Sequence, residues 1–318
     1  MVAILGSGFG LYGYLPALVG GCGQRVVLPE SYRVRLAERP ELVRFAGSVH
    51  WAPDEASALD CADEIVVALR PIDQSKRIPP LLKRADTRGL LLEKPLADSP
   101  ETAATLLHDL ISSQKVIRMG YTFRYTPWGE QLRNTFRETR EKRSLLIEWK
   151  FLAHHFRHDL DNWKRFNASG GGALRFYGIQ LIALLGEIGY RDVVWSRSTG
   201  PSANEIEKWS ACLAGAGLPN CNVTVDTKAE VESFRVEWLA GSRAEDDVVL
   251  ANMPHPFAST DAVSQTEGLD PRVPALTYLC RSLWQETINE YVCYEATINL
   301  WRAIEARTQF QMPDSQTS

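Results

Sequence analysis

The first part of the chain alternates short apolar runs with longer segments that have helical spacing. Apolar runs bounded by turn residues predict buried strands, and strands separated by single helices favour a parallel, doubly wound sheet. Ser99, Pro100 and Glu101 predict a helix start, with an N-cap, a proline at the first position and an acid in the first turn. The predicted strands are residues 2–5, 25–28, 48–51, 64–69, 90–92 and 116–119, and the predicted helices include 13–19, 33–38, 74–84 and 100–112.

The pattern changes after about residue 125. Further predicted strands follow one another without clear helices between them, which favours a mainly antiparallel sheet. A strong helix is predicted over residues 173–185. A closing helix, broken or bent along its length, is predicted over about 274–306, with a core-facing apolar stripe made of Leu279, Leu283, Ile288, Tyr291, Ile298, Trp301 and Ile304. The last dozen residues are expected to fray. These further strands are residues 145–153, 205–213, 222–227 and 232–239.

Composition and charge argue against some partners. The 318 residues are 45% hydrophobic and 23% charged, which is typical of a soluble chain with two domains. A formal net charge of −4 gives no reason to expect nucleic acid or an anionic membrane as a partner. No apolar run reaches the roughly 18 residues of a membrane span. The six cysteines form no CxxC pair and we see no secretion signal, so we expect a cytoplasmic protein with reduced thiols.

Glycines crowd the end of the first predicted strand, in the stretch Gly6-Ser7-Gly8-Phe9-Gly10-Leu11. Gly6 and Gly8 fit the first two glycines of a dinucleotide fingerprint, in which the first permits a tight turn and the second lets a diphosphate approach the backbone. The third fingerprint position is Leu11, with glycine one place earlier at Gly10. The alternative is a tight turn that binds nothing.

An acidic residue, Glu30, lies 22 positions beyond Gly8, just past the second predicted strand. An acid there can accept both ribose hydroxyls and repels a 2′-phosphate, which favours NAD over NADP. The nearby Arg33 and Arg35 can reverse that preference, so the predicted cofactor is NAD or NADP, with NAD favoured. The alternative for Glu30 is a solvated loop acid.

Four motifs carry a resemblance to a known family. They are GSGFGLYGYLPAL at residues 6–18, Glu93-Lys94-Pro95, GYTFRY at 120–125, and three glycines at 170–172 that open a helix. With them the chain resembles, over nearly its whole length, the glucose–fructose oxidoreductase, inositol dehydrogenase and rhizopine-catabolism family (Gfo/Idh/MocA).

The resemblance implies an α/β fold with two domains and an enzymatic function. Residues 1–122 would form an N-terminal Rossmann domain with a doubly wound parallel sheet. Residues 123–318 would form a C-terminal α/β domain with an open, mainly antiparallel sheet, used for substrate binding and oligomerisation. The activity implied is NAD(P)-dependent hydride transfer to or from a sugar, nucleotide sugar, cyclic polyol or related carbonyl. A homo-oligomer, either dimer or tetramer, is expected.

The resemblance also implies roles for the residues around the fifth strand. Lys94 would lie at the junction of nicotinamide and substrate, with Glu93 before it and Pro95, often cis in the family, after it. Independently, the carboxyl end of a parallel strand faces the ligand crevice, and an ammonium group there can assist at a reacting oxygen. Arg70 and Pro71 follow the fourth strand and are expected near the nicotinamide ribose. The alternative for Lys94 is a surface lysine before a turn.

One family feature is absent. Family dehydrogenases commonly carry Asp and His four residues apart on the helix after the glycines, and here these positions are Phe176 and Gln180. Phenylalanine has no proton to transfer, and glutamine is no general base near neutral pH. Three explanations remain open: another group supplies the proton, the substrate is easier to reduce, such as an imine, or the chain is a silent nucleotide-binding relative. The proton candidates are Lys94, Tyr177, Tyr121 and a histidine of residues 153–158, with Lys94, Tyr177 and Gln180 taken as the catalytic set.

The segment at residues 152–166 is polar and matches the family's substrate-lining stretch. Its HHxxH spacing does not favour a metal, because no helical spacing supports a ligand set and the family chemistry needs none. Arg124 is expected to bind an anion in the cleft, with a structural ion pair as the alternative. The predicted substrate-binding residues are Tyr121, Arg124, His154, His155, Trp163, Lys164 and Arg175.

Overall fold

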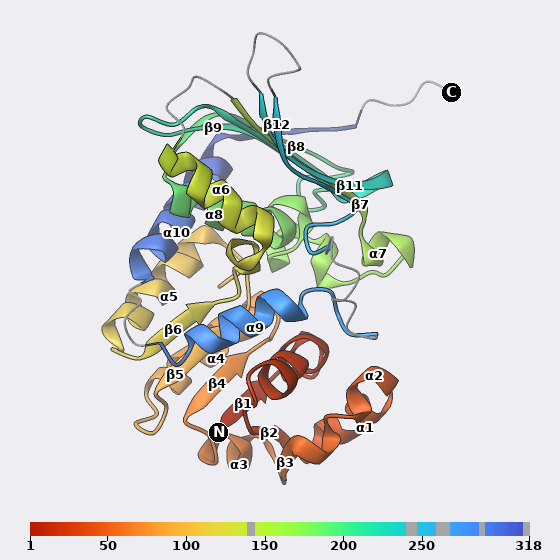
Figure 1. The fold of residues 1–318 in the computed structure, drawn as a ribbon, viewed down its shortest axis with the longest axis vertical. Coiled ribbons are helices and arrows are strands. Elements are labelled where there is room, and N and C mark those ends of the chain that lie inside the picture. The colour runs from red at the N-terminus through yellow and green to blue at the C-terminus, as the bar shows by residue number, and fades with distance from the viewer. Residues whose placement is uncertain (139–143, 240–246, 259–267, 286–289, 314–318) are drawn as a thin grey trace. The chain divides into compact units, whose positions relative to one another are not determined.

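The computed structural model describes residues 1–138, 144–239, 247–258, 268–285 and 290–313. The chain divides into two compact units, each built from segments that are separate in the sequence (Figure 1). Unit 1 comprises Met1–Ala97, Thr105–Tyr125 and Ser259–Tyr291, and unit 2 comprises Asp98–Ala104, Thr126–Ala258 and Val292–Ser318. The sequence suggested one boundary at residues 122 and 123, whereas the chain passes between the units several times.

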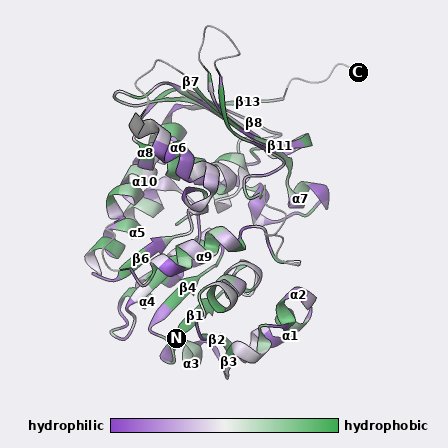
Figure 2. Cartoon of the chain, viewed as in Figure 1, coloured by the Kyte–Doolittle hydropathy of each residue, from purple (hydrophilic) through white to green (hydrophobic). Residues whose placement is uncertain are grey.

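A six-stranded sheet forms the centre of unit 1, with the order β3-β2-β1-β4-β5-β6. All neighbouring pairs are parallel, so the predicted doubly wound sheet is confirmed. The strand sequences VAIL, VVLP and EIVV are almost wholly apolar, as expected for strands buried on both faces (Figure 2). The strands are β1 (Val2–Leu5), β2 (Val26–Pro29), β3 (Val49–Ala52), β4 (Glu64–Val67), β5 (Gly89–Leu92) and β6 (Val116–Met119).

Helical segments connect these strands. The predicted helix at 13–19 begins earlier than expected, since π-helical turns cover Gly10–Tyr14 (η1) and Ala17–Gly21 (η2). The predicted N-cap of the helix at 100–112 is confirmed, because the Ser99 hydroxyl accepts the Thr102 amide. The remaining helices are η3 (Glu30–Tyr32), α1 (Arg33–Ala37), α2 (Pro40–Val43), η4 (Ala46–Ser48), α3 (Glu55–Asp60), α4 (Pro71–Leu82), α5 (Pro100–Ser112) and η5 (Thr122–Tyr125).

One further helix, α9 (Val273–Ser282), belongs to unit 1 although it comes late in the chain. Its Leu276 and Leu279 share an apolar cluster with Ile4 of β1 and Leu15 of the glycine-rich helix. The fully buried Arg118 of β6 fixes the end of α9. Its Nε donates to the Ser282 carbonyl at 2.9 Å and its Nη2 to that of Gln285 at 2.6 Å, so it satisfies carbonyls that a helix end leaves unpaired.

A mixed seven-stranded sheet forms unit 2, with the order β12-β11-β7-β10-β9-β8-β13. It is mainly antiparallel, as predicted, apart from the parallel pairs β7 with β10 and β8 with β13. The strands are β7 (Ser144–Leu152), β8 (Asp192–Thr199), β9 (Lys208–Ala214), β10 (Cys221–Asp226), β11 (Lys228–Leu239), β12 (Val248–Met253) and β13 (Thr308–Gln311).

The longer helices of unit 2 lie on one side of this sheet (Figure 1). In α6 (Pro127–Glu138), Trp128 and Leu132 are buried while Glu130 and Gln131 are exposed, which gives the helix one apolar and one polar side (Figure 2). The other helical segments are α7 (His154–Arg157), η6 (Trp163–Arg165), η7 (Asn167–Ser169), η8 (Ala173–Gly178), α8 (Ile179–Ile188) and α10 (Tyr291–Arg307). Among the described residues no helix is both long and apolar enough to cross a membrane.

Three strands of unit 2 were missed by the sequence pattern. In β8 the buried positions are the small polar Ser196 and Ser198, while the apolar Val194 and Trp195 are exposed, so the usual signal is inverted. The polar segment of β13 pairs with β8, and the expectation that the whole C-terminal end frays was therefore wrong for residues 308–311. The third missed strand is β12.

The predicted closing helix is broken, as expected. It consists of α9, in unit 1, and α10, which lies almost entirely in unit 2, and Ile288 of its predicted apolar stripe lies outside the described residues. Trp301 is buried, in agreement with its prediction as a core residue.

Arg118 provides a test of how the end of α9 is stabilised. Arg118→Met leaves the Ser282 and Gln285 carbonyls without their donor, so we expect the free energy of unfolding to fall by about 2–4 kcal/mol. Chemical denaturation measures the change. Arg35→Met, at an exposed position of α1, is the control and should alter stability by less than about 0.5 kcal/mol. Equal effects of the two variants would contradict the role of Arg118.

Candidate functional site

The glycine-rich turn after β1 depends on Gly6. Its φ is +115°, and a Cβ built there would lie 2.2 Å from the Ala68 carbonyl oxygen, so no other residue fits without displacement of the backbone. The Gly6 amide donates to the Tyr32 hydroxyl at 2.9 Å. This contact joins the turn to the segment after β2, the region of the predicted ribose site.

Gly8 and Gly10 serve different purposes. Gly8 is exposed, and a Cβ built on it would meet nothing within 4 Å, so the space beside it is open to a ligand. A Cβ on Gly10 would lie 2.7 Å from Cγ2 of Ile4, which is the close approach of helix and strand that the third fingerprint glycine permits. Leu11, at the nominal third position, is instead buried in the core. The wider π-helical turn accompanies this shift by one residue.

The Phe9 ring is held in place by its neighbours. It makes edge contacts with Tyr12 and Tyr14, with ring centres 5.2 and 5.3 Å apart. A Cβ on Gly13 would lie 2.4 Å from this ring, so glycine at that position leaves room for it. The guanidinium carbon of Arg272 lies 4.2 Å from the centre of the Phe9 ring, which is within the range of a cation–π contact.

Glu30 already has a cationic partner. Arg33 donates from Nε and Nη2 to the two oxygens of Glu30, at 2.5 and 3.0 Å. This hydrogen bonding lowers the pKa of Glu30. Arg33 also lies 4.4 Å from the Trp51 ring centre. Glu30, an acid of the kind that favours NAD, and Arg33, an arginine of the kind that favours NADP, are therefore paired with each other on the exposed surface.

The turn that carries Lys94 is held on both sides. The Lys94–Pro95 bond is cis, as the resemblance implied. The buried Glu93 accepts two hydrogen bonds of 3.0 Å, one at Oε1 from the Tyr14 hydroxyl and one at Oε2 from the Lys94 amide. The side chain amide of Gln74, from α4, donates to the Glu93 carbonyl at 2.6 Å, and it lies 3.2 Å from the carbonyl oxygens of Pro95 and Leu96. The backbone around Lys94 is thereby fixed.

Burial sets the protonation states around this turn. It raises the pKa of Glu93, while the positive charges of Lys94 and Arg272 oppose the rise. Burial and the Glu93 charge raise the pKa of Tyr14, so its hydroxyl remains a donor to the carboxylate. The same two causes raise the pKa of Tyr121, and its hydroxyl is therefore a weak acid for proton transfer.

Other predicted residues of unit 1 have structural partners. Arg70 is exposed, pairs with Asp73 at 2.7 Å, and precedes Pro71, the first residue of α4. Arg124 forms an ion pair of 2.6 Å with Glu290, which is buried. The structural ion pair given above as the alternative for Arg124 is thus present.

In unit 2, aromatic rings surround the position where the family carries an acid. The Phe176 ring lies edge-on to those of Trp163 and Tyr177, with centres 5.1 and 4.8 Å apart, and the Lys164 ammonium is 5.4 Å from its centre. Gln180, one helical turn further on, is buried.

Tyr177 joins this cluster to the sheet. Its ring lies edge-on to Phe151 at 4.9 Å and to Trp149 at 5.8 Å, and both are residues of β7. Phe176 and Tyr177 thus contact the rings of neighbouring aromatic residues, with the charged Lys164 beside Phe176 and the His155 ring 6.3 Å from that of Tyr177.

The histidines of the polar segment differ in burial. His154 is exposed, with its ring centre 4.4 Å from that of His158. His155 is buried, and its Nδ1 has no hydrogen-bond partner among the described residues. Burial and the charges of Lys164 and Arg165 lower the pKa of His155 to about 4, so its imidazole is neutral at pH 7.

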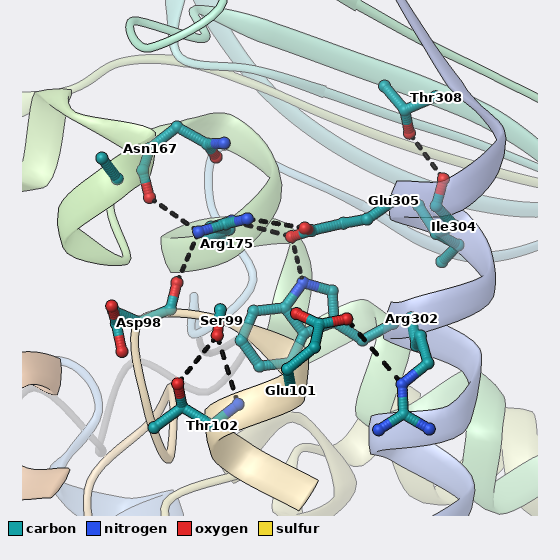
Figure 3. Close-up of polar contacts among 12 residues, drawn as sticks. Asp98, Ser99, Glu101, Thr102, Asn167, Arg175, Arg302, Ile304, Glu305 and Thr308 are labelled. Atoms are coloured by element: carbon teal, nitrogen blue, oxygen red, sulfur yellow. Dashed lines mark hydrogen bonds and ion pairs between the residues drawn. The ribbon is translucent and has the colours of Figure 1, made fainter.

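Arg175 is engaged within unit 2 (Figure 3). Its Nε and Nη2 donate to the two oxygens of Glu305 at 2.7 and 2.6 Å. Its Nη1 donates to the backbone carbonyls of Asp98 at 2.6 Å and Asn167 at 3.1 Å. Four hydrogen bonds fix this side chain, so its prediction as a substrate-binding residue gains no support from its contacts.

Sequence reasoning missed Gln74, Tyr32 and Arg272. Each contacts the glycine turn or the lysine turn from a distant point of the chain, and no local motif marks such a contact. That Lys94 meets Tyr177 and Gln180 at one substrate stays a prediction, as do the assigned roles of the other candidate residues. In the ranges that the structure describes, no group of three His, Cys, Asp or Glu side chains is placed to hold a metal ion.

The parallel sheet and the glycine turn define the class of unit 1. The strand order 3-2-1-4-5-6, with a glycine turn after the first strand, is that of Rossmann-type dinucleotide-binding domains. In such sheets the ligand lies beyond the carboxyl ends of the strands, and both the glycine turn and Lys94 follow carboxyl ends, those of β1 and β5.

Comparison with known proteins supports the fold of the whole chain. No protein-family model matches the sequence, and no curated protein matches it significantly. Among solved structures, the chain resembles GenD2 from gentamicin A biosynthesis in complex with NAD, with a TM-score of 0.71 and 18% identity, covering 96% of this chain and 92% of that one.

Two further solved structures show the same fold. KijD10, a 3-ketoreductase from Actinomadura kijaniata in complex with NADP and TDP-benzene, gives a TM-score of 0.70 at 15% identity, with 98% of each chain covered. A myo-inositol dehydrogenase from Corynebacterium glutamicum gives 0.68 at 14% identity, covering 97% of this chain and 96% of that one. The fold expected from the resemblance to the Gfo/Idh/MocA family is confirmed.

Gly6 and Gly8 allow the structural and binding roles of the turn to be separated. Gly6→Ala should lower the free energy of unfolding by roughly 2–4 kcal/mol, because of its positive φ and its contact with Ala68. Gly8→Ala should leave stability within about 0.5 kcal/mol but weaken NADH binding at least about tenfold, since the methyl group enters the open space. Denaturation and calorimetric titration measure the two effects. Unchanged NADH affinity in Gly8→Ala would exclude this turn as the binding site.

His155 gives a prediction for the pH dependence of stability. Its folded pKa of about 4 lies below the value of about 6.5 of an unfolded histidine, so the unfolded state binds more protons between these values. The free energy of unfolding should therefore fall as pH decreases from about 6.5 to 4. His155→Leu should lose part of this pH dependence, as measured by denaturation at several pH values. An identical slope in the variant would show that His155 does not titrate in this way.

Proposed function

We propose that this chain is an NAD(P)-dependent oxidoreductase that transfers hydride between nicotinamide and a substrate carbon. One observation carries the proposal: the open glycine turn and the fixed Lys94 turn are linked through the hydrogen bond between Tyr14 and Glu93. The glycine turn provides a place for a diphosphate, and the Lys94 turn holds the Lys94 ammonium group beyond the carboxyl end of β5.

The residues present fit a dinucleotide. The space beside Gly8, which a side chain would fill, suits a diphosphate, with Gly6–Leu11 around it. Glu30 and Arg33 would meet the adenosine ribose, and Arg70, Pro71, Glu93 and Lys94 would lie toward the nicotinamide end. We propose NAD as the cofactor, with NADP as the alternative because Arg33 is bonded to Glu30. When bound, the cofactor supplies or accepts the hydride.

Lys94 would assist at the reacting oxygen or nitrogen of the substrate. Its ammonium can polarise a carbonyl or donate a proton, and the hydrogen bonds of Glu93 and Gln74 would orient the backbone from which it extends. We propose a sugar, nucleotide sugar or cyclic polyol as the substrate class. Support comes from the fold shared with a 3-ketoreductase that was crystallised with TDP-benzene and with a myo-inositol dehydrogenase.

The remaining proton chemistry is proposed for unit 2, with Tyr177 and Gln180 as its groups. Phe176 cannot transfer a proton, and Gln180 can only hydrogen-bond. The alternatives that follow from this replacement are imine reduction, which needs a weaker donor, and a catalytically silent nucleotide-binding relative, and the comparisons with oxidoreductases do not favour them. The proposed oligomer and the cytoplasmic location rest on the resemblance and the sequence.

Lys94 provides the test of catalysis. Lys94→Met should lower turnover by about 10²- to 10⁴-fold while NADH affinity changes by less than about threefold, because the ammonium acts on the reacting atoms. The assay follows nicotinamide absorbance with NADH and NADPH, using keto-sugars, inosose and cyclic imines as oxidants.

The control for this test is Lys76→Met, at an exposed position on α4, which should retain full turnover. Nucleotide binding without turnover of any substrate by the wild type would favour the silent relative. Equal turnover in wild type and Lys94→Met would contradict the catalytic role.

A further inference from the structure

We propose that Arg272 forms a second anion-binding element beside the glycine turn and binds a diphosphate. This inference rests on the proposed function and assigns to the cofactor site a residue from the late segment of unit 1.

Asp270 holds the guanidinium in one orientation. Nε donates to Oδ1 of Asp270 at 2.8 Å and Nη2 to Oδ2 at 2.7 Å, while the Arg272 amide donates to Oδ1 at 2.9 Å. This bidentate pair occupies one edge of the planar group. Nη1 has no hydrogen-bond partner in the part of the chain that the structure describes, so its two N–H donors remain for a ligand.

Arg272 is fixed against the glycine turn itself. Its guanidinium carbon is 4.2 Å from the Phe9 ring centre and 5.8 Å from that of Tyr12. Phe9 directly follows Gly8, beside which the space is open. The Arg272 side chain keeps 30% of its exposure, so a ligand can reach the unpaired edge.

The position of Arg272 in the sequence adds to this geometry. It immediately precedes α9, a helix of ten residues, and its carbonyl accepts a hydrogen bond from the Leu276 amide, which fixes the backbone at Arg272. A ligand with two adjacent phosphoryl groups can contact the glycine turn with one and Arg272 with the other.

Two ligands of the proposed enzyme carry a diphosphate: the dinucleotide cofactor and a nucleotide-sugar substrate. The cofactor is favoured, because Arg272 stacks on the aromatic residue of the glycine turn that is proposed to bind it. The two sources are distinguished by titrating with ligands that contain one or the other.

The test compares Arg272→Gln with wild type by calorimetric titration. NADH and ADP-ribose should bind about 10- to 100-fold more weakly to the variant, because charge-assisted hydrogen bonds are lost. Adenosine, which has no phosphate, and TDP-glucose should bind as they do to wild type. Asp270→Asn, which weakens the hold on the guanidinium, should reduce NADH affinity by a smaller factor.

Arg281→Gln is the matched control, since Arg281 lies in the last turn of the same helix, stacks on Tyr278 and is bonded to the Gly21 carbonyl. It should bind NADH within about twofold of wild type. If Arg272→Gln does not fold, Arg272→Lys, which keeps the charge and loses the planar fork, should still bind NADH more weakly than wild type.

Three results would overturn the inference. They are unchanged NADH affinity in the folded Arg272 variants, an equal loss of adenosine affinity, and a loss confined to TDP-glucose. Failure of the proposed function is a separate outcome, in which wild type binds neither NADH nor NADPH. Titration with inorganic pyrophosphate then tests the anion site alone: binding that Arg272→Gln removes supports the site, and no binding overturns it.

Discussion

The buried carboxylate of Glu93 is the constraint on which the arrangement of unit 1 depends. A carboxylate removed from water is costly unless each oxygen is hydrogen-bonded, and here one oxygen accepts the Tyr14 hydroxyl and the other the Lys94 amide. Tyr14 belongs to the helix that starts at the glycine turn, so the two parts of the proposed cofactor site are linked through one side chain. The neighbouring Gly120 must stay small, because a Cβ there would lie 2.8 Å from Oε1 of Glu93. This requirement explains the glycine that opens GYTFRY.

The fold of unit 1 could be predicted because strands that are buried on both faces consist of continuous runs of apolar residues. The strands of unit 2 were harder to predict from the sequence. In β8, Ser196 and Ser198 are buried while Trp195 is exposed, so the apolar positions mark the exposed face of the strand instead of the buried one. The closing helix shows another limit. Its apolar stripe was recognisable, but a stripe does not say which core it covers, and Leu279 and Ile304 belong to segments of different units.

Some residues of the candidate site could be identified from the sequence and others could not. Gly6, Gly8 and Lys94 were recognisable because the chemistry requires particular residues at short spacings. Gln74, Tyr32 and Arg272 were not, because each acts across a long separation in the sequence, and any glutamine, tyrosine or arginine has the same local appearance. Charge alone does not indicate partners either: Arg124 and Arg175, which are predicted to bind substrate, each pair with a glutamate, Glu290 and Glu305, from late in the chain.

The two units place different demands on the proposed chemistry. In unit 2 the position of the usual acid is an aromatic ring among other rings, and burial keeps His155 neutral at pH 7. A group that must polarise a reacting atom is then most needed in unit 1, on Lys94. Buried polar side chains hold the backbone around that lysine. Gln74 donates to the turn's carbonyls and both Glu93 oxygens are bonded, so the backbone of Lys94 is held in one conformation before any ligand arrives.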